Sequence, residues 1–221
     1  SEFTLSCLSP DEFPVMGGDD LNHSFSLESK SLRSLIDRTK FAISNEETRY
    51  YLNGIYFHRA NNGKFEVLRT VSTDGHRLAS SEIKLPSGAE NIPGVIVPRK
   101  TVIELRKLID EFDAEIKLSL TETKIRFEFG DIVVTSKLID GTFPDYERVI
   151  PKENDKEFEV NSRILSSAVD RVSAISNEKS RAIKLSVEES KLILSASSPG
   201  HGSAVEEIEI DYKDEGAEIG F

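Results

Sequence analysis

The sequence of 221 residues predicts an α+β protein in which helices pack on one face of antiparallel sheets. Three observations lead to this fold class. The pentapeptide at 42–46 returns unchanged at 174–178, so the chain consists of copies of one unit about 130 residues long. Within a unit, each segment with helical periodicity precedes several segments that alternate like strands. Short polar turns separate those strands.

A second set of repeated residues shows where each copy lies along the chain. Ser6 matches Ser136, and the Phe-Pro pair at 13–14 matches the pair at 143–144, all at an offset of 130. We therefore expect three regions: the end of one unit at 1–23, a complete unit at 24–150, and the first half of a third unit at 151–221.

Each half-unit is expected to open with a helix. The first helix is predicted at 29–42 with Ser26 or Ser29 as its cap, the second begins at Pro98, and the third follows the cap Asn161. Their apolar stripes are Leu32, Leu35, Ile36 and Ile43; Val102, Leu105, Leu108 and Ile109; and Ile164, Leu165, Ala168, Val169 and Val172.

Three strand-like segments follow each helix. Asn62-Gly63 and Gly130-Asp131 supply the turn chemistry between two pairs of them. The predicted strands are 50–58, 65–71 and 77–83 after the first helix, 116–120, 125–129 and 132–138 after the second, and 183–187, 192–196 and 204–210 after the third.

Composition excludes several classes of protein. The single Cys7 cannot form an internal disulfide, which fits the cytoplasm, and no apolar run approaches the roughly 20 residues of a membrane span. The four histidines lie far apart, so no metal site or cofactor is expected. The net charge of −11 argues against a protein that reads nucleic-acid sequence, because such proteins usually carry a basic domain.

The helices nevertheless carry positive charge, whereas acidic residues crowd the predicted strands and loops. This segregation suggests cationic helices that face an anion, although each helix alone could be an ordinary solvated surface. The basic residues are Lys30, Arg33, Arg38 and Lys40 on the first helix, Arg99, Lys100, Arg106 and Lys107 on the second, and Arg163 and Arg171 on the third.

Five motifs occur along the chain: RYYLNG at 49–54, RTVSTDGHRLA at 69–79, VIVPRK at 95–100, TSKLIDG with FPDY at 135–146, and SNEK at 176–179. In order and spacing they resemble the bacterial sliding clamp, the beta subunit of DNA polymerase III. The resemblance covers essentially the whole chain, as the end of the first domain, all of the second and the opening of the third.

This resemblance implies a non-catalytic processivity factor with a DNA-clamp fold, in which two subunits form a ring with helices lining a pore. The implied partners are double-stranded DNA, the DNA polymerase III alpha subunit, the clamp loader and other proteins with a clamp-binding motif. Phosphate contact without base readout would let such a ring slide. The DNA-facing residues are expected among Lys30, Arg33, Arg38, Lys40, Tyr50, Tyr51, Arg99, Lys100, Arg106 and Lys107. Strand alternation would bury one of the two tyrosines.

The resemblance also implies a cleft that binds a short client peptide with apolar anchors. Apolar walls with a few polar anchors suit such a peptide. The alternative for the Asp74-Gly75 segment is a simple tight turn. The matched positions are Leu52, Thr73, Gly75, His76, Arg77, Leu78, Pro144, Arg148 and Val149.

Ala174 and Ile175 match positions of the dimer interface of the family, and the alternative is that they are buried apolar residues at a helix end. A homodimer is expected for the full-length protein, whereas a chain with only 1–23 of the first domain is expected not to close a ring.

Two other functions are alternatives to a clamp. A hydrolase built on Asp74 and His76 is disfavoured, because neighbouring residues on one turn do not assemble a nucleophile, base and orienting group. A repeat scaffold that binds proteins but not DNA fits the net charge. Charge reversal at Arg33 and Arg106 would separate it from a clamp.

Overall fold

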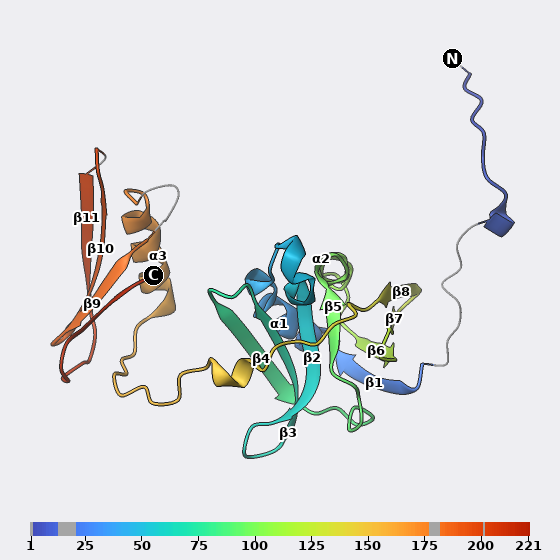
Figure 1. The fold of residues 1–221 in the computed structure, drawn as a ribbon, viewed down its shortest axis with the longest axis horizontal. Helices are drawn as coiled ribbons and strands as arrows, with labels where there is room; N and C mark the ends of the chain where they lie inside the picture. Colours follow the sequence, from blue (N-terminus) through green and yellow to red (C-terminus); the bar gives the residue numbers. More distant parts are fainter. Residues whose placement is uncertain (1, 13–20, 177–181, 201) are drawn as a thin grey trace. The chain divides into compact units, whose positions relative to one another are not determined.

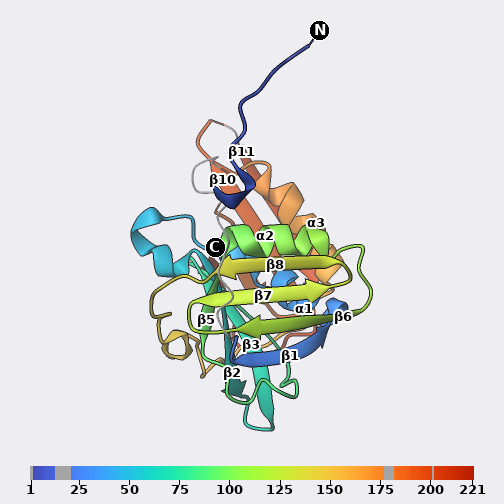
Figure 2. The ribbon, with the colours of Figure 1, turned by 90° about the vertical axis from the view of Figure 1, so that its right-hand side faces the viewer.

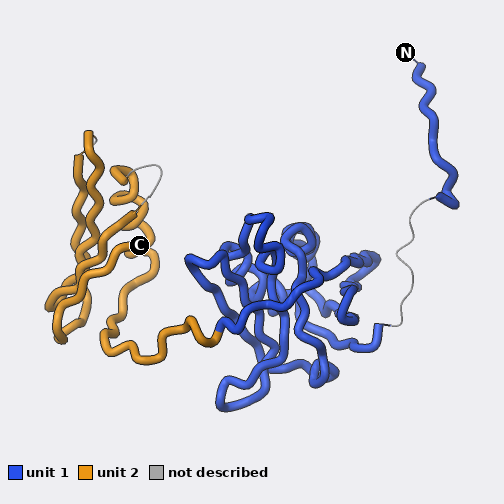
Figure 3. Tube along the Cα trace, in the orientation of Figure 1, with its two compact units in different colours: residues 1–146 blue, residues 147–221 orange. Residues whose placement is uncertain are grey.

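The computed structural model describes residues 2–12, 21–176, 182–200 and 202–221. The chain divides into two compact units, unit 1 at Ser1–Tyr146 and unit 2 at Glu147–Phe221, as Figure 3 shows. Each unit has its own hydrophobic core. The repeated Phe-Pro pair at 13–14 and residues 177–179 of the SNEK motif lie outside the described residues.

Unit 1 alternates helices with antiparallel strands. A 3-10 turn at Pro10–Glu12 precedes them. The elements that follow are β1 (His23–Glu28), α1 (Ser29–Asp37), η2 (Lys40–Ala42), η3 (Glu47–Leu52), β2 (Gly54–Asn61), β3 (Glu66–Thr73), β4 (Leu78–Lys84), β5 (Val95–Pro98), α2 (Arg99–Leu108), β6 (Glu115–Leu120), β7 (Lys124–Phe129) and β8 (Ile132–Lys137).

The strands of unit 1 form two four-stranded sheets with the orders β4-β3-β2-β5 and β1-β6-β7-β8 (Figures 1 and 2). Tyr56 lies opposite Val71 in the first sheet and Phe25 opposite Leu118 in the second. A hydrogen bond of 2.7 Å between the hydroxyls of Thr101 and Ser136 joins α2 to β8.

One core joins both sheets and both helices. Leu32, Leu35 and Ile36 of α1 are completely buried, and Leu105 of α2 is 1% exposed. Phe127 of the second sheet is also fully buried in this cluster. Because the helices cover apolar sheet faces, their opposite faces carry the charged residues.

Unit 2 repeats the first half of unit 1. One helix covers a single sheet of order β11-β10-β9-β12, which corresponds to β4-β3-β2-β5. Its elements are η4 (Tyr146–Arg148), which begins at the last residue of unit 1, α3 (Ser162–Ser173), β9 (Lys184–Glu188), β10 (Lys191–Ser198), β11 (Gly202–Glu209) and β12 (Ala217–Gly220). The predicted repeat and the α+β class are confirmed.

The first helix departs from its prediction. It ends at Asp37 rather than 42, because the hydroxyl of Thr39 donates to the Leu35 carbonyl at 2.7 Å and the chain then forms η2. Neither Ser26 nor Ser29 caps it: the N-cap position is Glu28, which makes no side-chain capping bond. The predicted cap Asn161 is confirmed, since its side chain accepts hydrogen bonds from two backbone N–H groups of α3.

Most predicted strands agree with the structure within a few residues, but 50–58 does not. Tyr50 and Tyr51 lie in η3, and the strand begins only at Gly54. Three strands, β1, β5 and β12, were not predicted. Two of them have only four residues, which is too short for alternation to be recognised.

Candidate functional site

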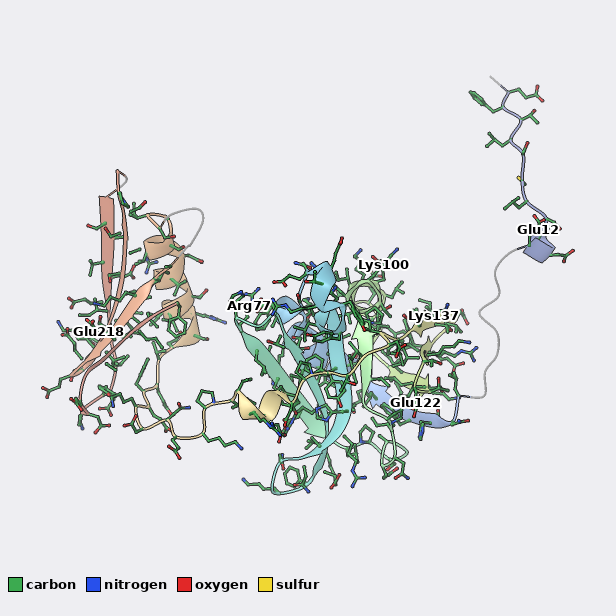
Figure 4. All side chains as sticks on the ribbon, viewed as in Figure 1. Glu12, Arg77, Lys100, Glu122, Lys137 and Glu218 are labelled. Carbon is green, nitrogen blue, oxygen red and sulfur yellow. The ribbon has the colours of Figure 1, made fainter. Side chains whose placement is uncertain are left out.

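The β3–β4 turn is held rigid by its own side chains. The Thr73 hydroxyl donates to the Arg77 carbonyl at 2.7 Å and accepts from the Gly75 N–H at 3.1 Å. Oδ1 of Asp74 accepts from the N–H groups of His76 and Arg77, at 3.0 Å each. The turn therefore presents its peptide groups and the exposed His76 in a fixed arrangement, with Arg77 beside them (Figure 4).

Gly75 is required by its neighbourhood. Its φ is +90°, and a Cβ there would lie 2.6 Å from Nη1 of Arg49. Arg49 is held in place by two hydrogen bonds to Glu46, of 2.8 and 2.5 Å, and donates to the Asp74 carbonyl at 3.2 Å. The Arg77 guanidinium lies 5.7 Å above the ring of Phe41, which is exposed.

The charge of Asp74 is also stabilised by the turn. Partial burial raises the pKa of its carboxyl, but the two backbone N–H groups and the Arg77 side chain, whose Nε lies 3.0 Å away, outweigh that effect. The net result is a pKa below the ordinary value. The carboxylate consequently serves the shape of the turn rather than proton transfer.

An apolar cluster lies beside this turn. Leu52 packs with Val71 and Phe143, and the half-buried Leu78 lies against them. Leu52 is only 4% exposed, so it lies beneath the surface of this apolar cluster, whereas Pro144 is exposed. The structure thus brings together the expected cleft residues of unit 1.

Aromatic contacts fix the segment that carries Pro144. Phe143 stacks on Tyr56 with centroids 4.8 Å apart and planes 7° apart. The Tyr146 hydroxyl lies 3.0 Å from Nε2 of His58 and accepts from Arg69 at 3.2 Å. Sequence reasoning did not select Tyr56 or His58; their strand alternation on β2 was the available signal.

The two remaining cleft residues, Arg148 and Val149, belong to unit 2. Val149 is 70% exposed. Arg148 lines a cavity of about 490 Å³ together with neighbours on the same segment, which are Glu147, Ile150, Pro151, Lys152 and Glu153.

The eight basic residues expected to face DNA divide into two groups; of these, Arg38 is the C-cap of α1 and Lys40 lies in η2. Five of the eight pair with carboxylates: Lys30 with Asp113 at 3.2 Å, Arg33 with Asp110 at 3.8 Å, Lys40 with Asp37 at 2.5 Å, Arg106 with Asp37 and Asp110 at 2.9 Å each, and Lys107 with Glu104 at 3.0 Å. Arg38, Arg99 and Lys100 are exposed and form no ion pair within the described part of the chain; Figure 4 labels Lys100.

Tyr50 and Tyr51 pack edge to face with centroids 5.8 Å apart. Tyr50 is 53% exposed, and Tyr51 is half-buried against the apolar cluster beside the turn. The prediction that strand alternation buries one of the two tyrosines is therefore wrong, because both lie in a 3-10 segment and neither is buried.

The positions matched to the dimer interface follow α3. Ala174 is the C-cap residue and is exposed, and Ile175 is half-buried. Among the residues that the structure describes, no group of three His, Cys, Asp or Glu side chains could hold a metal ion. No helix in the described ranges is long and apolar enough to cross a membrane.

Comparison with known proteins matches both units to one family. Residues 26–145 match the family model of the DNA polymerase III beta subunit, central domain, and residues 147–221 match that of its C-terminal domain. The beta sliding clamp of Caulobacter vibrioides is 50% identical over all 221 residues, and that of Escherichia coli K12 is 40% identical over 223. The chain spans 59% of the length of these curated relatives.

Solved structures agree. The Bartonella birtlesii sliding clamp bound to griselimycin matches with a TM-score of 0.92 and 51% identity, over 99% of this chain and 59% of that one. The Caulobacter crescentus clamp, with polyethylene glycol at a putative beta-motif tethering region, gives 0.93 and 50%, over 97% and 57%. The chain therefore belongs to the DNA polymerase III beta subunit family, the bacterial sliding clamps.

Proposed function

We propose that this chain acts within a homodimeric sliding clamp that encircles duplex DNA and tethers DNA polymerase III without catalysing a reaction itself. The observation that carries the proposal is the 50% identity to a sliding clamp over the whole chain. Within that protein we assign 1–23 to the end of domain 1, 24–150 to domain 2 and 151–221 to domain 3. The family-model match that ends at residue 145 supports a boundary slightly before 150.

Contact with DNA is proposed to run through phosphate and to be independent of sequence. Arg99 and Lys100 support this, because they occupy the first turn of α2, where cations oppose the helix dipole. Each such placement is disfavoured by about 0.3–1 kcal/mol, and neither residue pairs with a carboxylate in the described chain. An incoming phosphate would pair with both cations and could accept from N–H groups of the uncapped helix end other than that of Arg99, which donates to the Asn53 carbonyl at 2.9 Å.

Client proteins, among them the polymerase alpha subunit and the clamp loader, are proposed to insert a peptide beside the β3–β4 turn. The rigid turn and the adjoining apolar cluster support this, as does the tethering region named for the Caulobacter crescentus clamp. An apolar peptide side chain buried there would contribute roughly 1.5–3 kcal/mol. Ala174 and Ile175 are proposed as dimer contacts, and the cytoplasm as the location.

Loading on DNA tests the ring. A full-length clamp that carries this chain should stay on nicked circular DNA after clamp loading and leave when the circle is cut. Arg99→Gln with Lys100→Gln should weaken loading, whereas Asp131→Asn, in the β7–β8 turn and outside α2, is the control. Equal loading of all variants would favour the scaffold that binds proteins but not DNA. These residues replace Arg33 and Arg106, whose charges are already paired.

The cleft is tested by peptide binding. His76→Ala removes an exposed side chain on the turn. The substitution should lower the affinity for a fluorescent clamp-binding peptide by about fivefold, the equivalent of about 1 kcal/mol. Ser80→Ala, also exposed but on β4, is the matched control. Equal affinity of both variants for the peptide would contradict the cleft assignment.

A further inference from the structure

A row of ion pairs joins α1 to the end of α2 and to the segment that follows α2. Passing along α1, Lys30 lies against Asp113, Arg33 against Asp110, and Asp37 against Arg106. The partners follow in reverse chain order, so the two segments run antiparallel here. We call these six residues the α1–α2 seam.

Arg106 is the most strongly held member of the seam. Its Nε donates to both carboxylate oxygens of Asp37 at 2.9 Å, and its Nη1 donates to Asp110 at 2.9 Å. Its side chain is only 23% exposed. Hydrogen bonds with these two carboxylates raise the pKa of the guanidinium further above its ordinary range.

Arg33 is held in a similar way. Its Nη1 donates to the backbone carbonyl of Asp110 at 3.0 Å and its side chain is 22% exposed. Lys40 shares the carboxylate of Asp37 with Arg106. The carboxylates of Asp37 and Asp110 therefore pair with Arg33, Lys40 and Arg106.

We propose that Asp37 and Asp110 withhold Arg106 from DNA, so that Arg106 positions the two helices while Arg38, Arg99 and Lys100 contact phosphate. The inference rests on the proposed DNA-encircling function. It explains why a surface with eight basic residues need not bind DNA tightly. A ring that retains DNA by enclosure gains mobility when few cations are free to bind phosphate.

The strength of the restraint is modest, because partly exposed ion pairs contribute up to about 1 kcal/mol. Replacement of Asp37 by Asn preserves a hydrogen-bond acceptor but removes its charge. We expect Asp37→Asn to raise the affinity for a short duplex by about twofold to fivefold. The logarithmic salt dependence of binding should become steeper by about 0.9 for each cation released to a phosphate.

The deciding experiment is a double-mutant cycle in the full-length clamp. Wild type, Asp37→Asn, Arg106→Gln and the double variant are titrated with duplex DNA at about 50–200 mM salt, and the slopes of log affinity against log salt are compared. Arg106→Gln should reduce the slope by about 0.9 in the Asp37→Asn background and leave it nearly unchanged in the wild type. Asp37→Asn also releases Lys40, but this happens both with and without Arg106→Gln. Its effect on the slope therefore cancels when those two variants are compared.

Two results would overturn the inference. Arg106→Gln could reduce the slope equally in both backgrounds, which means that Arg106 already contacts DNA. Alternatively, Asp37→Asn could behave like the control Asp131→Asn, which removes one acidic charge that is not part of the seam. A thermal melt of each variant verifies folding. If Arg99→Gln with Lys100→Gln also leaves the slope unchanged, the DNA-contact proposal itself fails, and the two failures are thereby distinguished.

Discussion

The helix α1 of unit 1 and the helix α3 of unit 2 begin with the same pattern and differ in what covers them. Ser29 and Ser162 open the two helices, which aligns Leu32 with Leu165. Leu32 is completely buried, whereas Leu165 is half-buried. In unit 1 a second helix and a second sheet share the core, but the described residues of unit 2 contain neither. Identical periodicity therefore specifies which face of a helix turns inward, and the neighbouring elements determine how deeply it is buried.

The strongest test of this comparison is a matched pair of core truncations. Leu32→Ala should lower the free energy of unfolding of unit 1 by about 3 kcal/mol or more, because it leaves a cavity in a closed core. Leu165→Ala should cost unit 2 about half as much, since solvent already reaches that side chain. Calorimetry of the whole chain would resolve the two effects, and equal losses would show that the difference in burial is energetically unimportant.

The second test concerns the helix starts. Asn161 accepts hydrogen bonds from the N–H groups of Arg163 and Ile164 at 3.0 and 3.3 Å, whereas Glu28 caps nothing. Asn161→Ala should therefore destabilise unit 2 by about 1 kcal/mol. Glu28→Ala should leave unit 1 within about 0.5 kcal/mol of wild type. Chemical denaturation followed by circular dichroism measures both, and a larger loss at Glu28 would contradict the assignment of the caps.

The third test exchanges residues between equivalent hairpins. Gly63 follows β2 with φ +86°, and Ser190 follows β9 with φ +64°, a left-handed conformation that side chains with a Cβ resist. Gly63→Ser should destabilise unit 1 by about 1 kcal/mol. Ser190→Gly should stabilise unit 2 by about 0.5 kcal/mol, because the relieved strain is partly offset by the chain entropy of glycine. Changes of the same sign in the two units would refute the argument.

The smallest effect concerns pH. Partial burial raises the pKa of Asp37, but hydrogen bonds from Arg106 and Lys40 outweigh it, so the folded pKa is below the ordinary value. Such a group stabilises the fold above its unfolded pKa and loses that contribution as the pH falls through the folded pKa. The stability gap between wild type and Asp37→Asn, below about 1 kcal/mol at neutral pH, should close as the pH falls through the lowered folded pKa of Asp37.

The parallel test in unit 2 is Glu218→Gln, which removes an exposed pair with Lys184 at 2.7 Å. Hydrogen bonds with Lys184 and Ser186 lower the pKa of Glu218, so its stability gap should close in the same direction. Melting temperatures measured across the acid range provide the comparison. A gap that widens as the pH falls would reverse the sign expected for Asp37.

Much of the fold could be predicted because it depends on local periodicity. The repeat, the α+β class, the cap Asn161 and eight of the nine expected strands agree with the structure, since alternation and turn residues act over a few neighbours. The exceptions are instructive. The helix α1 ends at Asp37, and the 3-10 segment at Glu47–Leu52 occupies the start of the predicted strand, which begins only at Gly54.

The candidate site was predicted as a set of positions, whereas the tertiary structure decided what each position does. Sequence by itself determined that Gly75 follows Asp74 in a turn and that the two predicted helical segments of unit 1 carry eight basic residues. Only the fold placed Arg49 where a Cβ at Gly75 would lie, and Asp37 within 2.9 Å of Arg106 across 69 residues of chain. Whether a charge is free or paired depends on a partner brought close by packing, and periodicity carries no information about such long-range neighbours.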